Sequence, residues 1–269
     1  MTQAPACAIL KSRALVAVGG PSWRDFLQGL LTQDVETLAR GETRLAALLT
    51  PQGRLLHDMF LIGEADGCRL DVAAGEREAV VQRLAMYRLR AKVEIAPDDA
   101  PVLALFPGPL ARAGWSADPR LPALGLRGYG TAPPADAKMV EEAAYEAHRL
   151  ALGVPGPADW GSETVYPIEA NFDLLGGIDF KKGCFVGQET TSRMKRRGQI
   201  KTRMLPIVFK GPPPAPGAEV LAGTLRAGEV RSIGEGRAMA LLRLDRIEGA
   251  ALTVDGRPIS VERPGWMIG

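Results

Sequence analysis

The chain has 269 residues, enough for roughly one to three compact domains, and 46% of them are hydrophobic. A formal net charge of +2 gives no global sign of a nucleic-acid-binding protein, so any electrostatic specialisation must be local. No apolar run approaches the roughly 20 residues that a membrane-spanning helix needs, and three scattered cysteines exclude a disulfide framework.

Strands and two helices alternate in the first half of the chain. The predicted strands are 11–18, 45–50, 55–62, 68–72, 93–95 and 102–106. Ser22 and Asp25 are placed as a capping box for a first helix, and apolar residues recur at helical spacing from 76 to 90. Pro51-Gln52-Gly53 has the residues of a tight turn and predicts a hairpin. This order predicts an α+β fold with a largely antiparallel sheet.

The second half contains one clear helix and a small β unit. An apolar stripe predicts a helix over 136–152, which Gly153 and Pro155 end. A proline-rich break at 211–217 marks a small C-terminal unit, for which short strands are predicted at 205–209, 219–221, 238–244 and 251–261, with a hairpin turn at Asp255-Gly256. The predicted divisions are an α+β region over 1–205, an internal break near 108–135, and a small β-barrel over 206–269.

One cysteine stands in an unusual setting. Cys184 lies between Gly183 and Gly187, behind Lys181 and Lys182, at what the pattern predicts as the start of a helix. Neighbouring cations and the positive end of a helix dipole both favour a thiolate. We therefore predict that Cys184 is a nucleophile or a ligand for a soft metal.

The remaining cysteines and the two histidines give weaker signals. Cys68 on an alternating strand is predicted to be a small buried hydrophobe, and Cys7 to be inert in a mobile tail. His57 and His148 are predicted to have structural roles, and the scattered cysteines argue against a closed zinc site. A Cys–His catalytic pair stays open, because such partners meet in space and not in sequence.

A basic run follows the cysteine. Eight cations stand between 181 and 203, almost without acids, and they suit a polyanion such as a polyglutamate tail or an RNA backbone. A solvated helix face is the alternative. Gln188 and Glu189 are candidates for a functional role. For Glu189 the alternative is that an acid in the first turn of a helix only compensates the helix dipole.

Upstream, Glu169 and Asn171 would share a side if their segment is extended. A carboxylate can accept two parallel hydrogen bonds from an amino-pyrimidinone edge, as presented by guanine or a pterin. An ordinary surface glutamate is the alternative.

The segment Lys182-Gly183-Cys184-Phe185-Val186-Gly187-Gln188-Glu189 resembles the signature Lys-Gly-Cys-aromatic-x-Gly-Gln-Glu of the YgfZ family. These are folate-binding proteins of iron–sulfur cluster assembly, related to the glycine-cleavage-system T-protein. Further segments similar to the family pattern are 26–29, 32–35, 49–54, 145–155, 169–178 and 191–197. The resemblance therefore covers most of the chain before residue 210.

The resemblance implies a ring-like arrangement of α+β domains and a small β-barrel around a central cavity that binds tetrahydrofolate. Glu169 matches the glutamate that holds the pterin in T-protein relatives, and Tyr145 matches an aromatic residue that faces folate in some members. Cys184 would be a reactive thiol or a transient ligand of a shared iron–sulfur cluster. The predicted folate-binding residues are Glu169, Asn171, Tyr145, Lys181, Lys182, Gln188, Glu189 and Arg193.

One departure from the T-protein pattern limits the predicted activity. Aminomethyltransferases carry a catalytic aspartate where this chain has Ala79 or Val80, and neither can move a proton. We therefore predict an accessory protein that binds tetrahydrofolate and assists the assembly or repair of 4Fe–4S proteins. It would not be a conventional enzyme. Its partners would be iron–sulfur scaffold or client proteins, such as radical-SAM clients, because one cysteine cannot hold a cluster alone.

Two alternatives stay open. The first is a folate-dependent one-carbon transferase or demethylase that uses Asp34, Asp58 or Glu189 as its acid or base. The second is a tRNA-modification accessory that binds RNA through the basic run 193–203, with a steep dependence on salt. Because no secretory signal is visible in the first eleven residues, we expect the protein to be located in the cytoplasm of a bacterium or in the mitochondrial matrix of a eukaryote.

Overall fold

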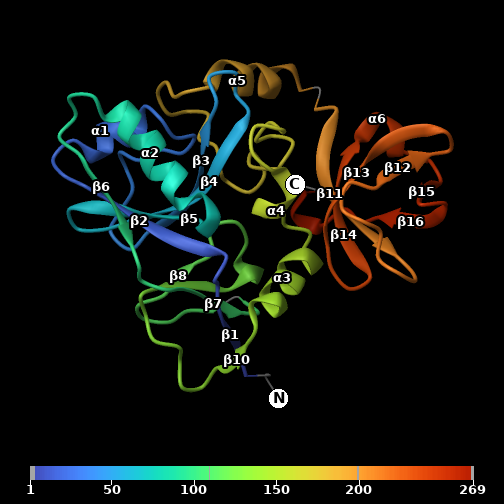
Figure 1. The fold of residues 1–269 in the computed structure, drawn as a ribbon, viewed down its shortest axis with the longest axis horizontal. Coiled ribbons are helices and arrows are strands. Elements are labelled where there is room, and N and C mark those ends of the chain that lie inside the picture. The colour runs from blue at the N-terminus through green and yellow to red at the C-terminus, as the bar shows by residue number, and fades with distance from the viewer. Residues whose placement is uncertain (1–3, 109, 199, 268–269) are drawn as a thin grey trace.

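The computed structural model describes residues 4–108, 110–198 and 200–267. Two five-stranded sheets form the N-terminal region, and a closed six-stranded barrel forms the C-terminal region. In Figure 1 one sheet lies above the other, and helices α3 (Glu142–Ala151) and α4 (Pro157–Trp160) lie between them and the barrel. The predicted α+β fold with a small C-terminal barrel is confirmed.

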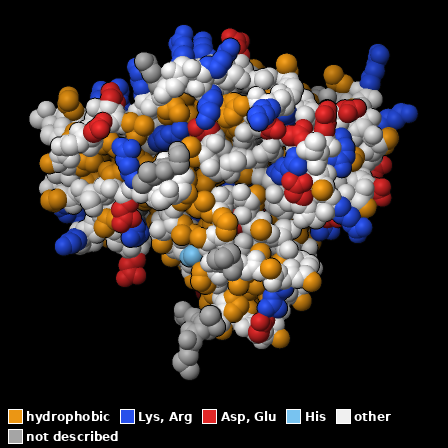
Figure 2. Space-filling view, turned by 180° about the vertical axis from the view of Figure 1, so that it is seen from behind, with side chains coloured by type: hydrophobic (Ala, Val, Ile, Leu, Met, Phe, Trp, Pro, Cys, Tyr) orange, Lys and Arg blue, Asp and Glu red, His pale blue; other side chains and the backbone are white. Residues whose placement is uncertain are grey.

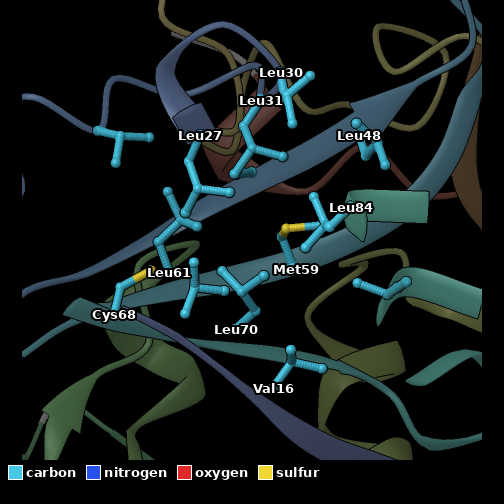
Figure 3. Close-up of a cluster of buried hydrophobic side chains, with 14 of the residues drawn as sticks. Val16, Leu27, Leu30, Leu31, Leu48, Met59, Leu61, Cys68, Leu70 and Leu84 are labelled. Carbon is cyan, nitrogen blue, oxygen red and sulfur yellow. The ribbon is translucent and has the colours of Figure 1, made fainter. Parts of the chain in front are cut away.

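The first sheet has the order β3-β4-β5-β2-β6. Its strands are β2 (Arg13–Gly19), β3 (Thr43–Leu49), β4 (Leu55–Gly63), β5 (Gly67–Ala73) and β6 (Glu94–Asp98). Helices α1 (Trp23–Gln28) and α2 (Arg77–Arg88) cover one face of it (Figure 1). Leu27 of α1 and Leu84 of α2 pack with Met59 and Leu61 of β4 in the core between them (Figure 3). The predicted hairpin is confirmed as β3–β4.

The second sheet has the order β10-β1-β7-β9-β8. Its strands are β1 (Ala6–Ile9), β7 (Val102–Phe106), β8 (Ser116–Ala117), β9 (Leu126–Tyr129) and β10 (Lys138–Val140). Cys7 is fully buried in β1, so its placement in a mobile tail was wrong. The segment 108–135 supplies two strands and is therefore no break. The predicted helix from 136 begins only at Glu142, because 138–140 pair with β1.

The barrel closes in the order β11-β14-β13-β12-β15-β16. Its strands are β11 (Thr202–Phe209), β12 (Glu219–Ala222), β13 (Leu225–Ile233), β14 (Arg237–Arg243), β15 (Leu252–Val254) and β16 (Arg257–Val261), with the short helix α6 (Leu244–Ile247). The first strand begins at Thr202, before the predicted boundary at 206. The Asp255-Gly256 turn between β15 and β16 is confirmed, whereas β13 was not predicted.

A buried network of ion pairs joins the two sheets. Arg13 on β2 pairs with Asp71 on β5 at 2.6 Å and with Asp58 on β4 at 3.0 Å. Arg127 on β9 pairs with the same Asp71 at 2.6 Å and with Asp118 at 3.1 Å. Because Asp71 bonds arginines from both sheets, the network fixes how the sheets lie against each other. Removing one member would leave a buried charge unpaired.

Candidate functional site

Cys184 is exposed in a loop and does not lie at the start of a helix. Helix α5 (Gln188–Arg197) follows this loop, and Gly187 is its N-cap in the left-handed conformation. The thiol is three residues before the cap. The prediction that Cys184 stands at the start of a helix was therefore wrong. What the loop provides is access to the thiol.

Lys182 holds the thiol loop, residues 181–187, against the end of α1. Its ammonium donates to the backbone carbonyls of Gln28 at 2.8 Å, Leu31 at 2.7 Å and Gln33 at 2.9 Å. Burial lowers the pKa of Lys182 to about 8, although the nearby charge of Asp34 opposes this. At neutral pH the ammonium therefore predominates, with all three N–H groups engaged. The folate contact predicted for Lys182 stays a prediction.

Two glycines bring the β3–β4 turn against the beginning of α5. Gly53 and Gly187 both have positive φ, 84° and 78°. A Cβ on Gly187 would lie 2.5 Å from the carbonyl oxygen of Thr50 and 2.9 Å from Cα of Gly53. Any side chain at Gly187 would therefore be strained by the positive φ and would clash with the neighbouring backbone. The contact couples the thiol loop to the turn that carries Arg54.

Glu169 lies half-buried beside the first strand of the barrel. Its carboxylate accepts the backbone N–H of Tyr166 at 2.8 Å, and its backbone carbonyl accepts the N–H of Met204 on β11 at 2.8 Å. Burial raises the pKa of the carboxyl, and the Tyr166 bond and the charges of Arg54 and Arg231 partly oppose the rise. Within the described residues the carboxylate has no other hydrogen bond, so it can accept further donors.

Arg54 and Arg231 are site residues that sequence reasoning did not single out. The guanidinium of Arg54 lies 4.5 Å from the ring centre of Tyr166 and donates to the carbonyl of Thr164 at 2.6 Å. Arg231 on β13 pairs with Glu229 at 3.3 Å, and its Nε is buried without a hydrogen-bond partner in the described part of the chain. A buried donor left unpaired is costly. Arg54 stands in a segment that is similar to the family pattern, whereas no sequence signal marked Arg231.

The stretch around Glu169 forms consecutive turns and is not extended. Asn171 is fully buried at a φ of 63°. Its amide donates to the carbonyl of Met204 at 2.8 Å and accepts from Arg203 at 3.0 Å. The condition under which Glu169 and Asn171 would share a side, an extended segment, is therefore not met. The amide of Asn171 fixes the turns to β11, and its predicted folate contact stays a prediction.

The other predicted folate-binding residues lie in different surroundings. Tyr145 is buried between the sheets, where Arg120 donates to its hydroxyl at 2.9 Å. Gln188 accepts the backbone N–H of Phe185 at 3.3 Å and closes the thiol loop. The exposed members are Lys181, Glu189 and Arg193. None of these five side chains has a hydrogen bond to Glu169 in the described part of the chain.

Helix α5 presents most of the basic run to solvent. Figure 2 shows lysine and arginine side chains gathered at the edge of the molecule where α5 lies in Figure 1. Arg203 departs from this pattern, because its guanidinium is buried and pairs with Asp173 at 2.9 Å. It also donates to the carbonyl of Ile168 at 2.9 Å and so fixes the Glu169 turns. Gln199 of the predicted run lies outside the described residues.

Two carboxylates proposed as an acid or base have structural partners. Although burial raises it, hydrogen bonds from Thr37 and Gln28 bring the pKa of Asp34 down to about 2. A carboxylate with so low a pKa is a weak proton acceptor near neutral pH. Asp58 pairs with Arg13 in the buried network. These contacts do not favour proton transfer by either residue.

The three cysteines differ in access. Cys7 and Cys68 are buried, and burial raises the pKa of both thiols, that of Cys68 to about 12. Such thiols are poor nucleophiles and ligands, so Cys184 is the candidate. Among the described residues, no three His, Cys, Asp or Glu side chains are grouped as a metal site, and no helix has the length and apolar content for crossing a membrane.

Known proteins resemble this chain in sequence. Residues 201–268 match the family described as CAF17, C-terminal beta-barrel domain. The human protein named iron-sulfur cluster assembly factor IBA57, mitochondrial, is 34% identical over an alignment 282 residues long, and the alignment covers 91% of this chain and 79% of that protein. A Neurospora crassa protein named as its homolog is 32% identical over 231 residues, which cover 74% of this chain and 53% of that protein. The chain thus spans about half the length of this fungal relative.

A solved structure resembles the chain in fold. It is the crystal structure of glycine cleavage system aminomethyltransferase T from Bartonella henselae, with a TM-score of 0.79 and 19% sequence identity. The match covers 98% of this chain and 86% of that one. At this identity the likeness establishes the aminomethyltransferase-like fold alone.

Proposed function

The chain belongs to the IBA57 family of iron–sulfur cluster assembly factors, and from that premise we propose that it assists the assembly or repair of 4Fe–4S proteins. The observation that carries the proposal is Cys184, an exposed thiol on a loop that Lys182 and Gly187 fix to the fold. Its motif favours the bacterial YgfZ branch of this family. We propose a reducing compartment, the cytoplasm in a bacterium or the mitochondrial matrix in a eukaryote.

In this proposal Cys184 is a ligand of a cluster in transit. Thiolate is the soft donor that iron–sulfur clusters require. A single thiolate cannot hold a cluster, so a scaffold, a client or a second chain supplies the other ligands. In the exchange, the Cys184 thiolate forms one bond to iron, and a thiolate of the donor leaves that iron and takes up the proton that Cys184 released. No oxidation or reduction is needed.

We also propose that Glu169 holds the pterin of tetrahydrofolate. A carboxylate with free acceptor capacity suits the paired N–H donors of an amino-pyrimidinone. The unpaired Nε of Arg231 is a donor that a carbonyl or carboxylate of the ligand would satisfy. Arg54 directly follows the turn in which Gly53 contacts Gly187. A folate bound beside Arg54 would therefore be linked to the thiol loop through this one rigid contact.

Titration of tetrahydrofolate into the purified chain under anaerobic conditions tests this assignment. Glu169→Gln keeps the shape of the side chain and removes its charge, and we expect affinity to weaken by roughly 2–4 kcal/mol. Glu248→Gln is the matched control, because that side chain is exposed on the barrel and belongs to no predicted site. Unchanged affinity in Glu169→Gln, or an equal loss in both variants, would remove the assignment.

A further inference from the structure

The end of α2 exposes a leucine in a conformation that favours glycine. The backbone N–H of Ala91 bonds the carbonyl of Arg88 at 2.7 Å, which closes a turn directly after the helix. Leu89 has φ 42° and ψ −105°, close to the first central position of a type II′ turn, where glycine is usual. Its side chain is nevertheless 89% exposed. Backbone strain of this kind is concentrated at functional sites.

Cations surround this leucine. The segment 83–93 holds four cations and no acidic residue. In the described part of the chain, no ion pair is formed by the exposed Arg88, Arg90 or Lys92. Met86 is 68% exposed beside them. We call this surface the α2 patch, and it consists of Met86, Arg88, Leu89, Arg90 and Lys92.

The α2 patch lies close to the thiol loop. At the beginning of α1, the backbone N–H of Ser22 bonds the carbonyl of Lys92 at 3.3 Å. Just after the end of α1, the carbonyl of Gly29 accepts the N–H of Val186 from the thiol loop at 3.3 Å. Helix α1 has 6 residues and is therefore about 9 Å long. The patch and the loop are thus separated by one short helix, and Figure 1 shows the end of α2 beside α1.

We propose that the α2 patch is a docking surface for an acidic protein partner. Leu89 would enter an apolar pocket of the partner, and acidic residues around that pocket would pair with Arg88, Arg90 and Lys92. An apolar anchor within a ring of charged contacts is the usual anatomy of a protein interface, and the charges fix its orientation. The proposal rests on the proposed function in one respect: a partner docked here could present its cluster to Cys184.

The composition of the patch favours a protein over a membrane or a nucleic acid. Of the other aliphatic side chains of α2, Val80 and Leu84 are buried in the core under the helix, and Val81 is partly buried against the same core. Two exposed apolar side chains are too few for a helix that lies in a bilayer surface. Tyr87 packs against the core, so the patch has no free aromatic ring on which a base could stack.

A photocross-linking side chain, p-benzoylphenylalanine, introduced at Met86 in cells that produce the full chain, tests the proposal. The same probe at Leu225 is the matched control, because Leu225 is 61% exposed on the barrel strand β13. We expect the probe at 86, and not at 225, to capture one acidic protein. A nucleic-acid or lipid adduct, or no adduct at 86, would overturn the proposal.

Affinity of the captured and purified protein separates docking from misfolding. Leu89→Gly removes the anchor and relieves the backbone, so we expect at least tenfold weaker binding with unchanged or higher thermal stability. Arg90→Glu should weaken binding as strongly, and Leu225→Ala should not. A loss below threefold in Leu89→Gly would overturn the proposal. Cys184→Ala should keep full docking, so failure of the thiol role and failure of docking give different results.

Discussion

Replacement of Lys182 by methionine tests how the thiol loop is held. The methionine side chain keeps the apolar stem, but three backbone carbonyls, those of Gln28, Leu31 and Gln33, lose their donor. Hydrogen bonds from a charged group contribute about 1.5–3 kcal/mol each. The cost of burying the ammonium, visible in its lowered pKa, offsets part of that sum. We therefore expect a net loss of about 2–4 kcal/mol in the free energy of unfolding.

Urea unfolding and the rate at which Cys184 reacts with a thiol reagent measure the two consequences. The matched control is Lys181→Met, because Lys181 is the adjacent lysine and is exposed. We expect a stability change within about 0.5 kcal/mol for this control. Lys182→Met should also change the thiol reaction rate, since the loop is no longer held against α1. Equal and small effects in both variants would refute the structural role of Lys182.

Two further predictions concern the groups around the thiol loop and Glu169. Gly187→Ala should destabilise the fold by at least about 2 kcal/mol by thermal unfolding, and more than Gly176→Ala, because Gly176 has a φ of 70° but open space around it. Equal losses would show that φ alone matters. For Glu169 the folded pKa is raised, so the folded chain holds its proton more tightly and stability falls as pH rises from the ordinary carboxyl pKa through the raised one. Glu169→Gln should remove that slope in urea unfolding, and an unchanged slope would contradict the burial of the carboxylate.

Local patterns were sufficient to predict much of the fold. The β3–β4 hairpin follows from the turn residues after Thr50, and the last barrel hairpin from Asp255-Gly256. Helix α2 follows from apolar residues at helical spacing. In each of these cases the residues that decide the structure are neighbours in the sequence, so a short window contains the whole signal.

Structure that depends on distant pairing was missed. Residues 138–140 extend an apolar stripe that suits a helix, yet they pair as a strand with β1 from the other end of the chain. The helix predicted at Cys184 starts only at Gln188, because the loop before it is anchored to α1 through Lys182. No local pattern could reveal that three carbonyls would surround this ammonium.

The candidate site also contains residues that local sequence patterns revealed and residues that only distant packing places there. The thiol was found from its glycines and lysines, and Glu169 from its resemblance to a pterin-binding glutamate. Arg231 was missed, because only the packing of β13 brings its charge close enough to act on Glu169. Arg203 looked like part of a basic surface, yet its pairing with Asp173 draws it into the interior.

Uptake of a cluster by the purified chain tests the central claim most directly. A glutathione-ligated 2Fe–2S cluster would be added under anaerobic conditions to the unmodified chain and to Cys184→Ala, and the re-isolated protein examined by absorption spectroscopy for iron–thiolate bands and by mass analysis for bound folate. We expect the unmodified chain to retain the cluster through Cys184, with glutathione or a second chain supplying the other ligands, and Cys184→Ala to lose it, with the same folate content in both. Equal cluster retention by the two proteins would contradict the role of Cys184.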